Sequence, residues 1–241
     1  MNPPTHAEAV ALAMAIAEAT AGSAAVCVVC PPTIWLEAVS AAVGDLLEVG
    51  AQTMAAEDGG AFTGETSPLM LAGLARWVIV GHSERRQHNG ETDEAVGRKV
   101  ASAVAHGLRP IAAIGERREE RRTGATEAVI DRQLRAAIAG LGQIAGSGLV
   151  VAYEPVWAIG TGDPASGADA QAAAGQIRGL LREADAAGAS EVPILYGGSV
   201  TTANAAEFFA ETDVDGALVG GASLDPAGFA RITQVAAELR G

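Results

Sequence analysis

Leu149-Val150-Val151-Ala152-Tyr153-Glu154 is a continuous apolar run that ends in a carboxylate. A run without polar alternation is typical of a strand covered on both faces, as in a parallel sheet. Six other short apolar runs occur along the chain, and helical patterns separate them. They lie near residues 24–30, 47–52, 77–81, 110–115, 194–197 and 216–220. The repeated alternation predicts a parallel α/β fold.

A helix precedes the first of these strands. Thr5-His6-Ala7-Glu8 has the T-x-x-E pattern of a capping box, and alanine-rich sequence continues to about Thr20. The expected order is therefore seven strands and eight helices, whereas a closed (β/α)8 barrel needs eight strands. This order fits either an open doubly wound sheet or a TIM barrel without its first strand. Because no linker or repeat interrupts residues 1–241, we expect a single domain.

Composition excludes several functional classes. The 241 residues carry a net charge of −13, with 49% hydrophobic residues and a mean hydropathy of +0.22. An acidic surface of this kind repels nucleic acid and anionic membranes. No apolar stretch is long enough for a transmembrane helix, and the start of the chain does not resemble a signal peptide.

Two further patterns have plain interpretations. Cys27 and Cys30 fall within an expected strand, where positions i and i+3 point to opposite faces. We therefore expect structural, reduced cysteines and a cytoplasmic protein, rather than a redox pair or half a zinc site. The mixed charges of Arg117–Arg122 favour a solvated helix face.

Chemistry in parallel α/β folds gathers beyond the carboxyl ends of the strands. His82 directly follows one strand, and Glu154 ends another. A carboxylate at the end of an apolar strand needs a cavity or a partner. Glu154 is therefore either a general base, with a pKa raised by burial, or one half of an ion pair with an arginine.

Two kinds of loop follow the later strands. Residues 155–162, Pro-Val-Trp-Ala-Ile-Gly-Thr-Gly, have a stiff apolar beginning and a small tip, which predicts a lid that excludes water from the substrate. Gly197-Gly198-Ser199 and Gly220-Gly221 offer backbone N–H groups for a phosphate. The chain contains no G-x-x-x-x-G-K-[ST] loop, so a nucleoside triphosphate is not the expected ligand.

Taken together, five segments closely resemble the triosephosphate isomerases, and the resemblance covers essentially the whole chain. The segments are V-G-H-S-E-R-R (80–86), Y-E-P-V-W-A-I-G-T-G (153–162), Y-G-G-S-V (196–200), D-G-A-L-V-G-G-A-S-L (215–224) and G-A-F-T-G-E (60–65). The resemblance implies a TIM barrel without cofactor or metal. It also implies a glycolytic and gluconeogenic enzyme that interconverts dihydroxyacetone phosphate and glyceraldehyde 3-phosphate through an enediol.

Roles follow from the matching segments. Glu154 is implied as the base that moves the carbon-bound proton, and His82 as the neutral imidazole that polarises the carbonyl group. Glu84 supports the site, and Thr63 lies on the loop that docks into a second subunit of a homodimer. The implied phosphate ligands are the backbone amides of Gly160, Ser199, Gly220 and Gly221.

One departure bears on activity. Members of the family begin with a strand that ends in an Asn-x-Lys-Met-Asn-like segment, whereas this sequence starts at Met1-Asn2. A start assigned at an internal methionine would explain the difference, and the DNA upstream of Met1 decides the matter. Without that lysine and strand, a chain of these 241 residues is expected to be weakly active or inactive. The alternatives are an isomerase of a related sugar phosphate, such as a tetrulose phosphate, and a non-catalytic homologue that acts as a binding protein.

Overall fold

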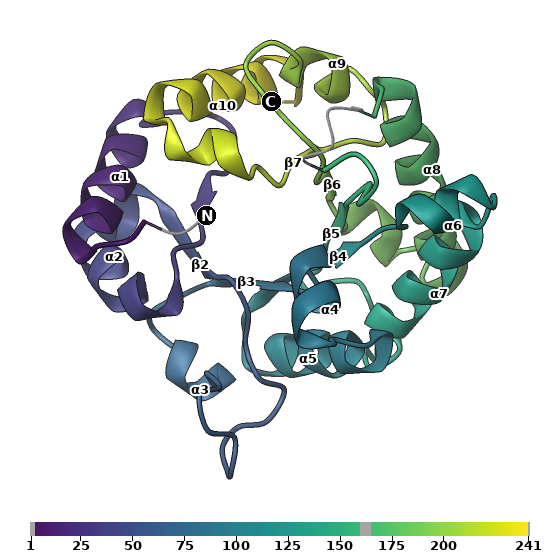
Figure 1. The fold of residues 1–241 in the computed structure, drawn as a ribbon, viewed down its shortest axis with the longest axis horizontal. Helices are drawn as coiled ribbons and strands as arrows, with labels where there is room; N and C mark the ends of the chain where they lie inside the picture. The colour runs from purple at the N-terminus through teal and green to yellow at the C-terminus, as the bar shows by residue number, and fades with distance from the viewer. Residues whose placement is uncertain (1–2, 160–164, 241) are drawn as a thin grey trace.

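The strands form one curved parallel sheet around a centre, with helices on its outer side (Figure 1). The computed structural model describes residues 3–159 and 165–240. Within these residues the sheet order is β1-β2-β3-β4-β5-β6-β7, so neighbours in sequence are neighbours in space. This is the TIM-barrel arrangement with seven strands, as predicted. The strands are β1 (Val28–Val29), β2 (Glu48–Ala51), β3 (Trp77–Val80), β4 (Arg109–Ile114), β5 (Val150–Tyr153), β6 (Ile194–Tyr196) and β7 (Gly216–Ala217).

The first and last strands are shorter than expected. Apolar sequence predicts strands over 24–30 and 216–220, but only Val28–Val29 and Gly216–Ala217 have strand geometry. β1 pairs only with β2, and β7 pairs only with β6, among the described residues. A strand with one partner has half the ladder hydrogen bonds of a central strand, so less of it is held in extended form.

The described residues form ten α-helices, two more than predicted. Eight of them take the places expected for a (β/α)8 barrel, and the short α4 and α6 are added in the loops after β3 and β4. The helices are α1 (His6–Ala19), α2 (Leu36–Val43), α3 (Pro68–Leu71), α4 (Ser83–Asn89), α5 (Asp93–Ala105), α6 (Arg118–Arg122), α7 (Thr126–Ile138), α8 (Gly167–Ala184), α9 (Ala205–Phe209) and α10 (Pro226–Arg240). Both added helices lie at the carboxyl ends of strands, where the chemistry is expected.

The start of α1 is confirmed. The Thr5 side chain accepts a hydrogen bond from the backbone N–H of Glu8 at 3.2 Å, which satisfies one of the donors left free in a first helical turn. None of the described helices combines the length and the apolar character that a membrane span requires.

Side chains of each strand alternate between two cores. In β3, Val78 and Val80 belong to the large cluster beneath the helices, whereas Trp77 and Ile79 belong to a second cluster inside the barrel. The cysteines separate in the same way, because Cys27 packs against the outer cluster and Cys30 against the inner one. Both thiols are free, so the prediction that they do not converge is confirmed.

Candidate active site

His82 is placed by a sharp turn at the end of β3. Gly81 has φ +73°, a left-handed conformation that only glycine adopts without strain. A Cβ there would meet the Ala113 carbonyl oxygen at 3.0 Å and Cγ2 of Val96 at 2.9 Å. The turn therefore needs glycine, and it makes His82 the N-cap residue of α4.

The hydrogen bonds of His82 identify its neutral tautomer. Nδ1 accepts the backbone N–H of Glu84 at 3.3 Å, so in the neutral ring the proton lies on Nε2. Nε2 is 3.0 Å from Oε1 of Glu154. The imidazole can therefore present an N–H group toward the centre of the barrel, which is what a group that polarises a carbonyl needs.

Glu154 lies at the end of β5 and is buried, with a relative exposure of 2%. Oε1 faces His82, and Oε2 accepts the backbone N–H of Ser83 at 2.8 Å. Its partners are thus a histidine and the first turn of a helix, not an arginine. Both oxygens are occupied, so a substrate that uses this base has to displace at least one of these contacts.

Room for the Glu154 side chain comes from glycines at neighbouring strand ends. A Cβ on Gly197 would meet Cγ of Glu154 at 2.8 Å, and a Cβ on Gly115 would overlap the Glu154 backbone carbonyl. The glycines that follow β4 and β6 therefore let the carboxylate and its backbone approach the adjacent strands.

The environment of His82 shifts its pKa upward overall. Burial of the ring lowers the pKa, but the hydrogen bond and the charge of Glu154 outweigh burial, so the pKa lies above the ordinary value of 6.5. Glu84 adds a smaller upward effect. The contact with Glu154 thus favours the protonated ring, and burial opposes it.

Glu84 contributes through its backbone more than through its side chain. Its carboxylate is 76% exposed and lies 3.9 Å from Nδ1 of His82, beyond hydrogen-bond distance. The backbone N–H of Glu84, by contrast, holds the imidazole. The supporting role expected for Glu84 stays a prediction. The distances favour its backbone N–H over its carboxylate for that role.

Unused N–H donors lie where a phosphate site is expected. The backbone N–H groups of Ser199, Gly220 and Gly221 donate no hydrogen bond to any other described residue. The three residues are exposed and line the same cavity as His82 and Glu154. Free amides of this kind attract an anion without any cationic side chain.

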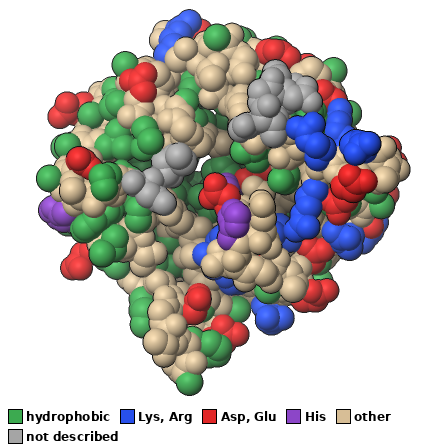
Figure 2. All heavy atoms as spheres, viewed as in Figure 1, with side chains coloured by type: hydrophobic (Ala, Val, Ile, Leu, Met, Phe, Trp, Pro, Cys, Tyr) green, Lys and Arg blue, Asp and Glu red, His purple; other side chains and the backbone are tan. Residues whose placement is uncertain are grey.

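The structure thus brings most of the predicted site together. His82, Glu84, Glu154, Ser199, Gly220 and Gly221 all line one cavity of about 1510 Å³. Figure 2 shows a hollow on this face, with acidic and histidine side chains at its rim and hydrophobic side chains below.

Three predicted features are not in this set. Thr63 is exposed on the loop between β2 and α3, which projects from the body of the molecule (Figure 1). Gly160 and the end of the expected lid over 155–162 lie outside the described residues. Within 155–159, Trp157 and Ala158 are buried, whereas Ile159 is 38% exposed.

A cluster around Trp157 was not predicted. Glu116, which is fully buried, accepts hydrogen bonds from the indole N–H of Trp157 at 2.8 Å and from the Tyr153 hydroxyl. Arg121 stacks 4.0 Å from the indole ring centroid, and Arg118 donates to the Trp157 carbonyl oxygen at 2.8 Å. Trp157 is therefore held by three residues, Glu116, Arg121 and Arg118.

The cluster corrects the interpretation of Arg117–Arg122 as a solvated helix face. That interpretation holds for Arg122, which is exposed and whose one ion pair among the described residues is with Glu119 on its own helix. Arg118 is also exposed, although it donates to the Trp157 carbonyl oxygen. The interpretation is wrong for Arg121, which is partly buried and stacks on the Trp157 ring. The signal that could have revealed these contacts was position, since α6 follows directly on the strand end at Gly115-Glu116.

Comparison with known proteins gives consistent matches. A sequence model described as "Triosephosphate isomerase" matches residues 1–236. The chain is 51% identical over 208 residues to a "Triosephosphate isomerase" of Chloroflexus aurantiacus, covering 85% of this chain and 83% of that protein. It is 50% identical over 216 residues to one of Symbiobacterium thermophilum (88% and 84%), and 47% identical over 217 residues to one of Vibrio cholerae (88% and 84%).

Proposed function

Because the chain belongs to the triosephosphate isomerase family, we propose that its site interconverts dihydroxyacetone phosphate and D-glyceraldehyde 3-phosphate through an enediol. The observation that carries the proposal is a buried carboxylate 3.0 Å from an imidazole nitrogen, in a cavity that also holds backbone amides with no acceptor among the described residues. An aldose–ketose isomerisation of a phosphorylated sugar requires a base, an electrophile and hydrogen-bond donors for the phosphate.

In the proposed reaction, Glu154 removes a proton from the carbon beside the carbonyl group. Nε2–H of His82 meanwhile gives a proton to the carbonyl oxygen, which produces the enediol. Glu154 then returns its proton to the former carbonyl carbon, and His82 recovers one from the other hydroxyl group. The substrate is isomerised with no net gain or loss of protons or electrons.

The phosphate group is proposed to bind the backbone amides of Ser199, Gly220 and Gly221, together with Gly160. This assignment suits a protein with a net charge of −13, because local N–H donors attract an anion that the wider surface repels. The lid over 155–162 would exclude water from the enediol.

A chain of these 241 residues is proposed to react slowly. Its one lysine, Lys99, is held by Glu91 and Thr53 and does not line the cavity. A developing oxyanion therefore meets the N–H of His82 without a nearby lysine. Loss of one such donor or charge typically lowers the rate by about 10²–10³-fold.

We further propose that the protein is a homodimer, with Thr63 on the docking loop. Three large apolar side chains near this loop are exposed: Phe62 at 45%, Leu69 at 57% and Met70 at 62%. Apolar surface gathered in this way favours a partner surface. Sedimentation equilibrium of the protein and of Phe62→Asp tests this proposal, because a dimer predicts a weaker association constant for the variant.

Turnover measurements separate the proposed function from its alternatives. The triose assignment predicts isomerisation of dihydroxyacetone phosphate in preference to a four-carbon ketose phosphate. A reversed preference would favour the tetrulose phosphate isomerase. The non-catalytic alternative gains its support from the two occupied oxygens of Glu154. The non-catalytic alternative predicts that a phosphorylated enediolate mimic binds but that neither substrate reacts, even in a chain to which an eighth strand has been added.

A further inference from the structure

His106 is fixed at the C-terminal end of α5 by its backbone. It is the C-cap residue of this helix, and Gly107 follows with φ +73°. The backbone N–H of Leu108 donates to the Ala103 carbonyl oxygen at 2.9 Å, and that of Gly107 donates to the Val104 carbonyl oxygen at 3.1 Å. These two bonds form a Schellman motif, so the position from which the imidazole projects is well defined.

Both ring nitrogens of His106 face oxygen atoms. Nδ1 lies 2.8 Å from the carbonyl oxygen of Ser102, one turn earlier in α5, and Nε2 lies 3.0 Å from Oδ1 of Asp58. A carbonyl oxygen and a carboxylate only accept hydrogen bonds, and a neutral imidazole has one N–H group. A neutral ring therefore turns one lone pair toward an oxygen. The protonated ring donates to both oxygens, and its charge suits a helix C-terminus.

Asp58 is the charged group that the ring of His106 contacts. Among the described residues, no other acidic side chain lies within 4.0 Å of the ring nitrogens. The cations at the starts of the neighbouring strands are held elsewhere, because Arg76 pairs with Glu48 at 2.8 Å and Arg109 lies over the Trp77 ring. α7 also packs against α5, and in the described part of the chain its charged residues form no ion pair with His106; they are Glu127, Asp131, Arg132 and Arg135.

Asp58 belongs to a loop that is otherwise weakly tied to the molecule. Residues 56–65, termed the outer loop, lie between β2 and α3 and project beside the end of α5 (Figure 1). The base of the loop is closed by the backbone N–H of Ala55, which donates to the Thr66 carbonyl oxygen at 2.8 Å. Beyond that bond, the Asp58–His106 pair is the only hydrogen bond or ion pair between the outer loop and the rest of the described chain.

The composition of the outer loop allows it to leave this pose. Gly59, Gly60 and Gly64 are three of its ten residues, and glycine has the widest choice of backbone conformations. The same loop carries Phe62, which is 45% exposed, and Thr63, on the surface proposed to dock into a second copy. Holding such a loop in one pose before it binds lowers the entropy cost of association.

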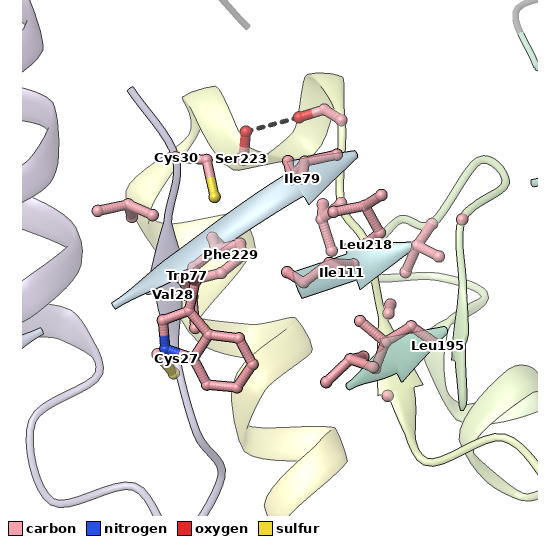
Figure 3. A pocket seen from close by; sticks show the side chains of 18 of the residues that line it. Cys27, Val28, Cys30, Trp77, Ile79, Ile111, Leu195, Leu218, Ser223 and Phe229 are labelled. Atoms are coloured by element: carbon pink, nitrogen blue, oxygen red, sulfur yellow. Dashed lines mark hydrogen bonds between the residues drawn. The ribbon is translucent and has the colours of Figure 1, made fainter. Parts of the chain in front are cut away.

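The Asp58–His106 pair is separate from the proposed active site. Neither residue lines the central cavity, whose apolar wall, with Trp77, Ile79 and Ile111, is shown in Figure 3. Substitutions of Asp58 or His106 therefore leave the residues of that cavity in place.

We propose that His106 and Asp58 form a pH-sensitive latch. The protonated imidazole holds the outer loop against the end of α5, and loss of the proton releases the loop. Histidine is the side chain that ordinarily changes charge between about pH 5 and 8, so the latch is closed at low pH and opens as the ring of His106 loses its proton. Association through the outer loop, which rests on the proposed homodimer, is then stronger when the latch is closed.

NMR measures the order of the outer loop, as the heteronuclear 15N NOE of the Gly59 and Gly60 amides at pH 5.5 and pH 7.5. We expect values close to those of helical amides at pH 5.5 and lower values at pH 7.5, with a midpoint that follows the titration of the His106 ring protons. The amide of Gly124, which donates to the Arg121 carbonyl oxygen, is the reference and should not change. A partly exposed ion pair changes an equilibrium by up to about fivefold, so the latched fraction should fall by a factor of this size.

Matched variants identify the residues responsible. Asp58→Ala removes the acceptor and should leave the outer loop mobile at both pH values. His106→Lys keeps a cation at both pH values and should keep the loop ordered at pH 7.5, whereas His106→Gln should remove the pH dependence. His6→Gln changes a histidine at the start of α1 and should behave like the unsubstituted protein. Circular dichroism identifies any variant that does not fold, and the two pH values compared on the unsubstituted protein remain decisive in that case.

Sedimentation equilibrium at the same two pH values tests the link to association. We expect an association constant up to about fivefold higher at pH 5.5. Asp58→Ala and His106→Gln should both remove this difference. A general loss of negative charge at low pH also favours association, but that effect would persist in both variants.

Two results would overturn the latch: equal loop order at the two pH values, or a pH dependence that survives in both Asp58→Ala and His106→Gln. Equal association constants beside a pH-dependent loop would overturn its link to docking. A monomer at both pH values would contradict the homodimer as well, while the loop measurement still decides the latch. None of these measurements involves turnover, so a failure here is distinct from a failure of the isomerase proposal.

Discussion

Nε2 of His82 lies 3.0 Å from Oε1 of Glu154, while Oε2 of the same carboxylate accepts the backbone N–H of Ser83 at 2.8 Å. The two groups assigned to the electrophile and the base therefore contact each other directly. A reacting substrate has to enter between them, so their contact governs the charge of the histidine.

This contact predicts a change in the titration of His82. In Glu154→Gln the ring loses the charge that holds its pKa above 6.5, while burial still disfavours the imidazolium, so the pKa should fall below that of the unsubstituted protein. NMR titration of the His82 ring protons measures it. Glu84→Gln, which removes an exposed charge 3.9 Å from Nδ1, should lower the pKa much less. Equal effects from the two variants would contradict the assignment.

The same pair predicts a pH dependence of stability. Because the folded-state pKa of His82 is raised, the His82–Glu154 interaction contributes fully below the unfolded histidine pKa of about 6.5. The contribution is lost as pH rises through the folded pKa. Urea unfolding should therefore show a larger destabilisation by His82→Gln at pH 6 than at pH 8.5, and a difference of the opposite sign would show that another group dominates.

Gly197 should tolerate no side chain. In Gly197→Ala the new Cβ would meet Cγ of Glu154 at 2.8 Å, so we expect a loss of about 1–3 kcal/mol in the free energy of unfolding and a changed His82 titration. Gly179→Ala is the control, since no atom lies within 4 Å of its Cβ position, and helix propensity favours it by up to about 1 kcal/mol. Similar unfolding curves for the two variants would refute the packing argument.

Arg121 should matter to stability where Arg122 does not. Arg121→Gln loses the stacking on Trp157 and the 2.7 Å ion pair with Asp169, so we expect a loss of about 1–2 kcal/mol. Arg122→Gln removes a side chain that is 74% exposed and should change stability by less than about 0.5 kcal/mol. Urea unfolding followed by circular dichroism measures both losses of stability. Equal losses for the two variants would mean that α6 is a solvated helix face.

Phosphate should bind at backbone amides. In a 15N-labelled protein, inorganic phosphate is expected to shift the amide signals of Ser199, Gly220 and Gly221, whose N–H groups are unused by other described residues. The amide of Gly146, which already donates to Glu191, serves as the reference. Shifts of the reference as large as those of the three amides would indicate non-specific binding.

The sequence predicted the strand order, and it predicted that residues at the strand ends line one cavity, because both depend on local patterns. Apolar runs mark central strands well, since each is buried on both faces, and residues at their carboxyl ends must converge. β1 was overestimated because an edge strand keeps its apolar sequence while it loses half of its hydrogen bonds. Ser83, Arg118 and Arg121 were missed for another reason. Their roles rest on a backbone N–H group and on contacts between segments far apart in sequence, which no local pattern contains.

The central claim is that Glu154 moves the carbon-bound proton. It is tested most directly by NMR, as the rate at which dihydroxyacetone phosphate exchanges its C1 proton in D2O. For a chain of these 241 residues we predict slow but measurable exchange, about 10²–10³-fold below that of a family member that has the active-site lysine. Glu154→Gln should abolish the exchange, and Glu84→Gln should retain most of it. Exchange at an unchanged rate in Glu154→Gln would contradict the account.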